Sequence, residues 1–527
     1  MNHPKLTPIP TVTQTVDVFG GCSRSGRLEA GQFRHMENLS SHNFPLLAPR
    51  PGRCFYRKPA SPQGLIAKDC LCYVDGSDFV LGDTVIPMNL SVRSEDCPKQ
   101  LVSMGAYVLI LPDKAYINTG DPEDRGFWDG EFTTDGTPEL TLCDDRGQQT
   151  DTPTHVKLTH PGIGAAFEAG DGVEITGWAG LPGGVIAACG EDYLVLPSTD
   201  PVTPPENAIT VARRSPRLDF ITECGNRLWG CRYGMDEGGE FVNRIYASKL
   251  GDFKNWNVFQ GLSTDSYAAS CGTDGPFTGA VSYFGNPLFF KETGFHKVYG
   301  SYPATFGIQH TACAGVQQGC HGSLAMVGDT LFYVSRDGIC AYDGSLPVTV
   351  AEDLGPLTLL GAAGGSCGSR YYLSAQTESG WDLYVYDAHR HLWHREDDLQ
   401  AHDFCTLKGR LYCVDGRNCN ILCLSGGRSD ERVRWSAETG EIGFSYPDGK
   451  YLAALQLRLQ LEAGSKLTLS ACYDGEAEFQ PLAVVFGTSL RSFRIPVRPR
   501  RCDHFRLKIE GEGGGKLYAI TKRLQRG

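Results

Sequence analysis

The chain has 527 residues, which is too long for one ordinary hydrophobic core and indicates about three folded units. Its 61 acidic residues outnumber the 49 basic ones, and a net charge of −12 repels a nucleic-acid backbone, which argues against sequence-specific DNA binding. The 64 glycines and 30 prolines, together with the scarcity of long helical patterns, favour an all-β fold of short strands and tight turns.

The N-terminal residues, the apolar runs and the cysteines indicate the compartment in which the protein folds. The first residues lack the charged-then-apolar pattern of a signal peptide, and no run of about 18 apolar residues occurs, so we expect a protein made in the cytosol without a membrane span. The 20 cysteines are sparse for a disulfide scaffold, and the Cys70, Cys72 and Cys419, Cys423 pairs lack CxxC spacing. We interpret the cysteines as reduced side chains that pack in the core.

A short motif recurs along the chain, with a turn glycine, one or two polar residues, and then Leu or Tyr before an aromatic residue that opens a strand. Two weaker copies lie at Cys70 and Gly105, and five clear copies have their glycine at Gly225, Gly285, Gly328, Gly368 and Gly409. The later copies are spaced by about 40 residues, the period of a four-stranded β-propeller blade. Seven copies predict about seven blades.

The repeat divides the chain into four predicted parts. Residues 1–119 hold the N-terminal segment and the first blades, and residues 120–213 form an insertion with glycine-rich turns, predicted to be a small β-barrel or sandwich. The insertion returns through a stiff proline-rich linker, residues 197–208. The remaining blades occupy residues 214–432.

Residues 433–527 form the fourth part, in which the repeat is absent. Apolar Leu455, Leu457 and Leu459 alternate there with polar residues, which is the period-two pattern of a half-buried antiparallel strand. We therefore predict a C-terminal β-sandwich.

Three histidines fall within the segment YVYDAHRHLWHRED, residues 384–397. A zinc site needs such imidazoles arranged as a tetrahedron with a further ligand. The repeat instead places His389 and His391 in a hairpin turn, with His394 on the opposite strand face from His391 and Trp393. We interpret the segment as a solvated turn and predict no metal site.

Catalytic motifs are missing from the sequence. It contains no GxSxG elbow, P-loop or HExxH motif, and Ser323 beside His321 fits a strand turn better than a catalytic pair. The SRDG run at Ser335 resembles a sialidase Asp-box only loosely, and glycoside hydrolysis also needs two carboxylates at a defined separation. We predict no catalytic residue and no cofactor.

Five residues are candidate glycan or partner contacts. Trp128 and Trp178 are amphipathic anchors of the kind found at interfaces, although tryptophans serve as core residues about as often. Arg498, Arg500 and Arg501 lie in a basic run that is either a partner surface or a solvated strand edge guarded by arginine.

Four segments resemble parts of tailed-bacteriophage virion proteins. They are ENLSSHNFPLLAPRPGR (37–53), NRIYASKLGDFKNWNVF (243–259), LFFKETGFHKVYG (288–300) and LFYVSRDGICAYDG (331–344). The chain is similar to the β-propeller nozzle, or tail tubular, proteins of short-tailed phages, but it is shorter and has one compact insertion. In that family several copies surround the axial channel below the portal and connector and retain the packaged genome until ejection.

The resemblance implies a non-enzymatic structural component of a bacteriophage or prophage tail, assembled in the host bacterial cytoplasm and located in the virion. It implies a homo-oligomeric ring, with portal, connector or other tail proteins as partners. Genomic DNA would pass without sequence-specific binding, and the acidic charge is compatible with a channel that does not grip phosphates. The alternative is a carbohydrate-binding or glycoside-hydrolysing propeller that recognises a host surface.

Overall fold

The computed structural model describes residues 11–91, 99–198, 203–236, 238–426, 429, 431–443, 449–498 and 500–526. Residues 199–202 of the predicted linker lie outside this description, as do the first ten residues and Cys97. The described residues form β-strands and four short 3-10 helices, so the all-β prediction is confirmed. No helix in the described ranges is long and apolar enough to cross a membrane.

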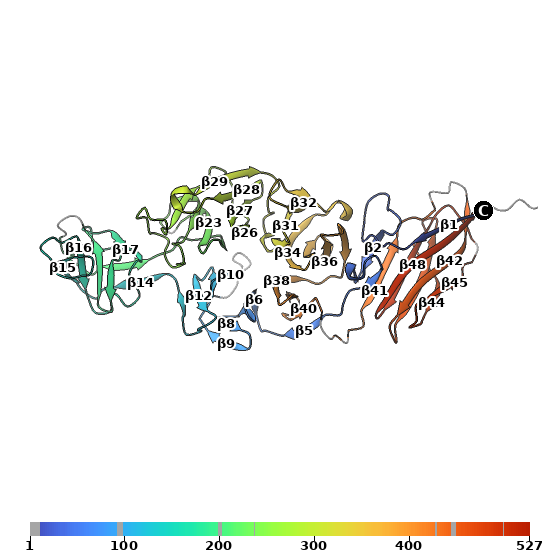
Figure 1. Cartoon of the computed structure of the whole chain (residues 1–527), viewed down its shortest axis with the longest axis horizontal. Coiled ribbons are helices and arrows are strands. Elements are labelled where there is room, and N and C mark those ends of the chain that lie inside the picture. Colours follow the sequence, from blue (N-terminus) through green and yellow to red (C-terminus); the bar gives the residue numbers. More distant parts are fainter. Residues whose placement is uncertain are drawn as a thin grey trace, which may run out of the picture. The chain divides into compact units, whose positions relative to one another are not determined.

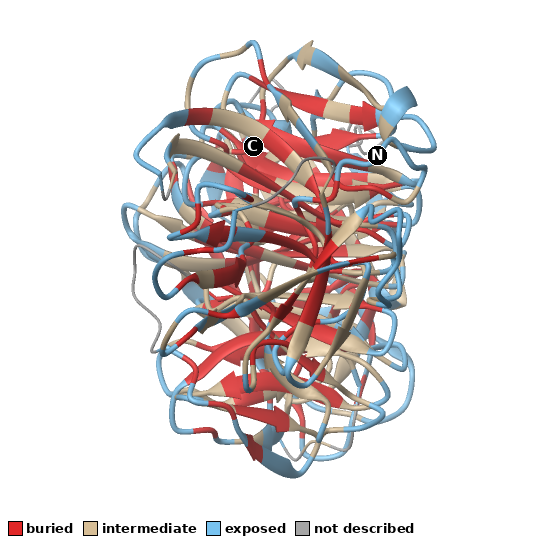
Figure 2. Ribbon diagram, turned by 90° about the vertical axis from the view of Figure 1, so that its left-hand side faces the viewer, coloured by how far each residue is buried: buried red, intermediate tan, exposed pale blue. Residues whose placement is uncertain are grey.

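The chain divides into two compact units. Unit 1 comprises Met1–Ala60 and Gly319–Gly527, and unit 2 comprises Ser61–Gln318. Buried residues follow the strands and exposed residues lie mostly in the loops (Figure 2). None of the cysteines in the described ranges forms a disulfide.

Unit 2 contains four antiparallel sheets in which four consecutive strands pair in chain order (Figure 1). The sheets are β6 (Pro62–Ala67), β7 (Leu71–Asp75), β8 (Asp78–Leu81) and β9 (Thr84–Pro87); β10 (Gln100–Met104), β11 (Tyr107–Leu111), β12 (Ala115–Asn118) and β13 (Arg125–Phe127); β22 (Phe220–Glu223), β23 (Leu228–Met235), β24 (Phe241–Ala247) and β25 (Tyr267–Ser270); and β26 (Gly279–Tyr283), β27 (Asn286–Lys291), β28 (Gly294–Tyr299) and β29 (Gly307–Ala312). The first strands of successive sheets contact one another, and a hydrophobic cluster lies between each neighbouring pair. Stacking of this kind is consistent with propeller blades, which bury their faces only against neighbours.

The insertion lies between β13 and β22. It forms two four-stranded sheets around one hydrophobic core. The strands are β14 (Gly130–Thr133), β15 (Glu139–Cys143), β16 (His155–Thr159), β17 (Gly172–Thr176), β18 (Gly183–Val185), β19 (Ala188–Gly190), β20 (Tyr193–Pro197) and β21 (Thr210–Arg213). Strand β21 ends at Arg213, and β13, which completes the preceding sheet, ends at Phe127.

Unit 1 contains three further four-stranded sheets. They are β30 (Ala325–Val327), β31 (Thr330–Ser335), β32 (Gly338–Tyr342) and β33 (Val348–Thr349); β34 (Leu359–Cys367), β35 (Arg370–Thr377), β36 (Gly380–Asp387) and β37 (Leu392–Arg395); and β38 (Ala401–Leu407), β39 (Arg410–Asp415), β40 (Ile421–Cys423) and β5 (Cys54–Arg57). The fourth strand of the last sheet therefore comes from the N-terminal part of the chain. Strand β5 pairs antiparallel with β40 and covers an edge that would otherwise lie open.

The C-terminal part of unit 1 has two five-stranded sheets over one large core. One sheet holds β1 (Thr11–Val16), β48 (Gly515–Arg526), β42 (Lys450–Leu461), β45 (Arg491–Ile495) and β46 (Arg501–Cys502), and the other holds β2 (Phe33–Glu37), β41 (Arg434–Thr439), β47 (Phe505–Glu512), β43 (Lys466–Tyr473) and β44 (Gln480–Val485). The short strands β3 (Leu39–Ser40) and β4 (Ala48–Pro49) form a separate pair.

The predicted division of the chain needs one correction at its N-terminus. Strands β1 and β2 pair with β48 and β41, so residues assigned to the segment 1–119 belong to the sheets formed by residues 433–527. The sequence gives no signal for this pairing because its two sides lie at opposite ends of the chain and share no turn.

The recurring glycines occupy equivalent positions in the sheets. Gly105, Gly225, Gly285, Gly328, Gly368 and Gly409 all have positive φ and lie in the turn between the first and second strands. The motif is therefore a hairpin signal, since glycine adopts the left-handed conformation without the steric cost that a Cβ atom imposes.

We expect Gly285→Ala to lower the free energy of unfolding by roughly 1–2 kcal/mol. Gly285 has φ +73, and an added Cβ would meet no atom within 4 Å, so the loss comes from backbone strain alone. The matched control is Gly272→Ala, because Gly272 also lies in open space but outside the left-handed region. Urea denaturation should show no loss, or a small gain, for the control. Equal destabilisation by both substitutions would contradict the strain argument.

Candidate functional site

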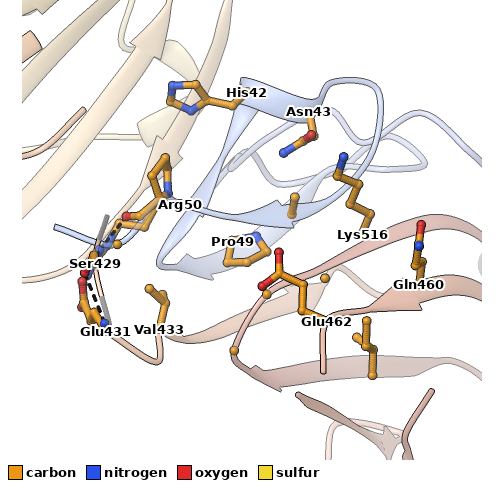
Figure 3. A pocket seen from close by; sticks show the side chains of 17 residues that line it. His42, Asn43, Pro49, Arg50, Ser429, Glu431, Val433, Gln460, Glu462 and Lys516 are labelled. Carbon is orange, nitrogen blue, oxygen red and sulfur yellow. Dashed lines mark hydrogen bonds and ion pairs between the residues drawn. The ribbon is translucent and has the colours of Figure 1, made fainter. Parts of the chain in front are cut away.

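A cavity of about 470 Å³ lies in unit 1 beside β4 and the adjacent ends of β42 and β48 (Figure 3). We call it the clamp cavity. Its lining includes Arg50, Glu431, Glu462 and Lys516, together with the glycines that precede Lys516. In Figure 3 the Arg50 side chain lies near Ser429 and Glu431, whereas Lys516 lies at the other end of the cavity.

Arg50 is the buried cation of this cavity. Its Nη1 and Nη2 donate to the two carboxylate oxygens of Glu431 at 3.2 and 2.9 Å, which is the bidentate geometry that favours arginine over lysine. Its Nε donates to Asn38 Oδ1 at 2.7 Å, and Nη1 also donates to the carbonyl of Pro51 at 3.0 Å. Four acceptor contacts therefore fix the guanidinium in one orientation.

Arg53 lies three residues further along and binds two more carboxylates. Its Nη1 and Nη2 donate to Asp397 at 2.6 and 2.9 Å, and Nη2 also donates to Glu396 at 3.0 Å. The backbone N–H of Arg53 donates to Glu431 at 2.8 Å, which joins the two arginines through one carboxylate. The cluster links the segment before β5 with the residues that follow β37 and with the segment that precedes β41.

Burial and the two guanidiniums act in opposite directions on the pKa values of the three acids. Burial works to raise the pKa of Asp397, but the charges and hydrogen bonds of Arg53 and Arg50 outweigh it and hold the pKa below its ordinary value. Burial is likewise outweighed at Glu431, whose pKa is lowered by the hydrogen bonds from Arg50 and from the backbone of Arg53. At Glu396 burial prevails over both arginines and raises the pKa.

In the cluster of Glu396, Asp397 and Glu431, no acid combines the two features of a glycosidase acid. A glycosidase acid needs a raised pKa and access to a substrate. Glu396 has the raised pKa but does not line the cavity, whereas Glu431 lines the cavity and has a lowered pKa. The carboxylates are held by arginines, so the cluster ties distant parts of the chain together.

The histidine-rich segment forms the predicted hairpin between β36 and β37, with residues 388–391 in the turn. His389 and His391 are exposed, and Nδ1 of His391 lies 3.0 Å from the hydroxyl of Tyr386. The prediction of a wholly solvated turn is wrong for His394, which is buried beside Trp393. The described residues contain no group of three or more His, Cys, Asp or Glu side chains that could hold a metal ion.

Asp387, which ends β36, is buried and organises the residues around this hairpin. Its Oδ2 accepts a hydrogen bond from Ser41 at 2.7 Å and from Arg390 at 3.0 Å, while Arg370 donates to Ser41 at 3.0 Å. Burial opposes these contacts, but they keep the pKa of Asp387 below its ordinary value. Ser41 donates directly to the aspartate, which is not the arrangement of a serine nucleophile activated by histidine.

We expect His394 to make the protein less stable as the pH falls from about 6.5 to about 4. Burial, only partly opposed by Asp387, lowers the pKa of His394 from 6.5 to about 4. The unfolded chain therefore binds a proton in this window before the folded chain does. Within this window the free energy of unfolding falls by up to about 1.4 kcal/mol for each unit by which the pH is lowered. Urea denaturation of His394→Gln should show a shallower pH dependence than the wild type.

The exposed His389 provides the control for this measurement. His389→Gln, the same substitution at an exposed position, shows how far the exchange of histidine for glutamine by itself changes the unfolding free energy. If His394→Gln and the wild type show the same slope between pH 6.5 and 4, the buried histidine does not contribute to acid sensitivity.

The two candidate tryptophans are core residues, which corrects their prediction as exposed contacts. Trp128 is 0% exposed and donates from Nε1 to Ser215 Oγ at 2.8 Å. Trp178 is 6% exposed and donates to the carbonyl of Thr203 at 2.9 Å within the insertion core. Neither indole can offer its face to a glycan, because each ring packs in a hydrophobic cluster and its polar edge is already satisfied.

The three candidate arginines are exposed around β46. Arg500 pairs with Glu476 at 2.5 Å and lies over the ring of Tyr473, with 5.2 Å between its Cζ atom and the ring centroid. Within the described ranges, Arg498 and Arg501 form no ion pair. Both interpretations of the basic run, a partner surface and a solvated edge, agree with this exposure.

The sequence did not point to the clamp cavity. Arg50 and Arg53 reach carboxylates more than 340 positions away, as in the contact between Arg53 and Asp397. One local signal was present: the dipeptide Glu396-Asp397 follows directly on a strand whose apolar pattern predicts burial, and buried acids need cationic partners.

Comparison with known proteins gives only distant structural matches. None of the family models or curated proteins compared matches the chain. Similar solved structures include exo-β-1,3-galactanase from Phanerochaete chrysosporium (10% identity, TM-score 0.22, covering 57% of this chain and 94% of that one) and BamB from Moraxella catarrhalis (10%, 0.24, 64% and 94%). A third is Trypanosoma rangeli sialidase (8%, 0.24, 99% and 96%). These values are too low to assign an activity or a substrate to the chain.

Proposed function

We propose that this chain is a non-enzymatic structural component of a bacteriophage or prophage tail. In this proposal the seven four-stranded sheets outside the insertion close into one β-propeller, the insertion is a small β-barrel, and the two five-stranded sheets form a β-sandwich. Several copies assemble into a ring around the DNA channel, in contact with portal, connector or other tail proteins, and genomic DNA passes through without sequence-specific binding. The protein assembles in the host bacterial cytoplasm and resides in the virion.

The observation that carries the proposal is the way N-terminal strands complete sheets formed by C-terminal residues. Strand β5 completes the sheet of β38, β39 and β40, and β1 and β2 lie in the two five-stranded sheets. A propeller closes when a strand from one end of the chain completes the blade formed by the other end, which leaves only short, protected edges.

The chemistry of unit 1 supports a structural role. Three acids beside the clamp cavity, Glu396, Asp397 and Glu431, are held by Arg50 and Arg53. Asp387 is held by Ser41 and two arginines. Carbohydrate recognition, the alternative function, loses the two aromatic contacts that the sequence nominated, since Trp128 and Trp178 are buried.

Negative-stain images of the purified chain and of phage particles test the proposal. We expect closed rings of the purified protein, and antibody labelling of the tail in intact particles. A chain that stays monomeric and is absent from particles would overturn the structural role. A strong, selective signal on a glycan array would favour the carbohydrate-binding alternative.

The exposed arginines give a sharper variant for the same test. We propose that Arg498 and Arg501 contact a neighbouring subunit, so Arg498→Glu combined with Arg501→Glu should abolish the rings through charge reversal without changing the melting temperature. Arg146→Glu, an exposed charge reversal in the insertion, serves as the control and should leave the rings intact.

A further inference from the structure

A second cavity, of about 1000 Å³, lies in unit 1 along the large core of the two five-stranded sheets. We call it the lysine cavity. Much of its inner lining is apolar and comes from Val16, Phe19, Phe33, Leu507 and Ile520. The loop of residues 26–32 and the segment 439–443 complete its wall. A cavity of this size can hold a small organic ligand.

One cation faces this apolar lining. Lys522 lies on β48 between Ile520 and Leu524, and all three residues are buried and occupy alternating positions on one face of the strand. Alternation therefore directs Lys522 inward, where the pattern otherwise places aliphatic side chains. The residue is only 7% exposed and lines the cavity.

Lys522 has no partner in the described part of the chain: no hydrogen bond or ion pair accompanies its ammonium group. Burial alone lowers its pKa, without an opposing contribution from a carboxylate. The other charged residues of the cavity lining are Arg27, Glu29 and Glu441, and Glu441 is already paired with Arg34 at 2.9 Å. The Lys522 nitrogen is not among the fully enclosed, unpaired side-chain atoms of the described residues, so it reaches the open space of the cavity, where a bound molecule can supply the acceptor that it lacks.

We propose that the lysine cavity binds an amphiphile with an apolar body and one carboxylate group, with the carboxylate paired to Lys522. The carboxylate supplies the hydrogen-bond acceptors and the negative charge that Lys522 lacks. The apolar body replaces water along Val16, Leu28 and Ile442, which line the cavity and are only half-buried. A neutral amphiphile gains only the apolar contact, and Lys522 repels a cationic one.

Isothermal titration calorimetry with the full chain tests this site, using octanoate, octanol and octylamine as probes of equal chain length. We expect octanoate to bind the wild-type protein at least tenfold more tightly than octanol, and octylamine to bind most weakly. Lys522→Met should lose the preference for octanoate while it still binds octanol. Arg523→Met, which removes an exposed cation from the same strand, should bind all three probes like the wild type.

Two results would overturn the proposal. One is the absence of octanoate binding to the wild-type chain, or octylamine binding that equals it, and this comparison does not depend on the folding of any variant. The other is a Lys522→Met protein with an unchanged thermal melt that keeps the preference for octanoate. The ring assembly can fail its own test without affecting either result, because the cavity lies within one chain.

Discussion

Replacing Arg53 by methionine is expected to lower the free energy of unfolding by about 3–5 kcal/mol, because removing one partner leaves a buried charge without compensation. Arg53 holds Asp397 through two hydrogen bonds and Glu396 through a third, and its side chain is only 11% exposed. Methionine fills a similar volume, so the loss reports the electrostatic contact rather than packing. Urea denaturation followed by tryptophan fluorescence gives the measurement.

The exposed pair of Arg417 and Asp398 provides a matched control. Its nitrogen and oxygen atoms are 3.0 Å apart, a distance similar to those between Arg53 and its two carboxylates, but both side chains are exposed to water. Arg417→Met should therefore cost less than about 1 kcal/mol. If the two substitutions lower the free energy of unfolding equally, burial does not strengthen the contacts of Arg53 with Asp397 and Glu396.

Acidification should reduce the difference in unfolding free energy between Arg53→Met and the wild type. The pKa of Asp397 is lowered in the folded wild type, so its contribution is present above the ordinary aspartate value of about 3.9 and is lost as the pH falls through the folded pKa. In the variant, burial acts on Asp397 with less opposition, and protonation relieves the uncompensated charge. A difference that stays constant from pH 7 to pH 3 would contradict this account.

The part of the fold that the sequence predicted is the part with local causes. A glycine at φ +63 such as Gly328 leaves a signal in a few neighbouring residues, because the turn needs that conformation whatever lies around it. The alternating pattern from Leu455 to Leu459 likewise reports a strand with one buried face. Both signals are read within one hairpin or one strand.

The features that the sequence missed depend on contacts between distant segments. The pairing of β1 with β48 leaves no local signal in the sequence. The acid pair that contains Asp397 indicates a cationic partner but does not identify that partner as Arg53. Alternation also cannot tell whether a lone tryptophan such as Trp178 faces a core or a partner. Lys522 did carry a local signal, since a lysine interrupts the apolar positions of β48, but it becomes informative only when the strand is known to face a cavity.

Trp128→Ala is expected to lower the free energy of unfolding by about 3–5 kcal/mol, because removing a fully buried indole leaves a large cavity. The ring lies in the cluster that joins the sheet of β10–β13 to the sheet of β22–β25, with its centroid 6.2 Å from that of Phe253. The substitution also takes from Ser215 the indole N–H that its Oγ accepts. Thermal and urea denaturation should both show the loss.

The neighbouring residue provides the control for this prediction. Phe127 precedes Trp128 in the sequence but is 48% exposed, so Phe127→Ala should change the free energy of unfolding by less than about 0.5 kcal/mol. A tryptophan that serves as a glycan contact gives the opposite pattern, in which truncation weakens ligand binding and leaves stability unchanged. A stable Trp128→Ala protein would therefore contradict both its place in the core and the packing of these two sheets against each other.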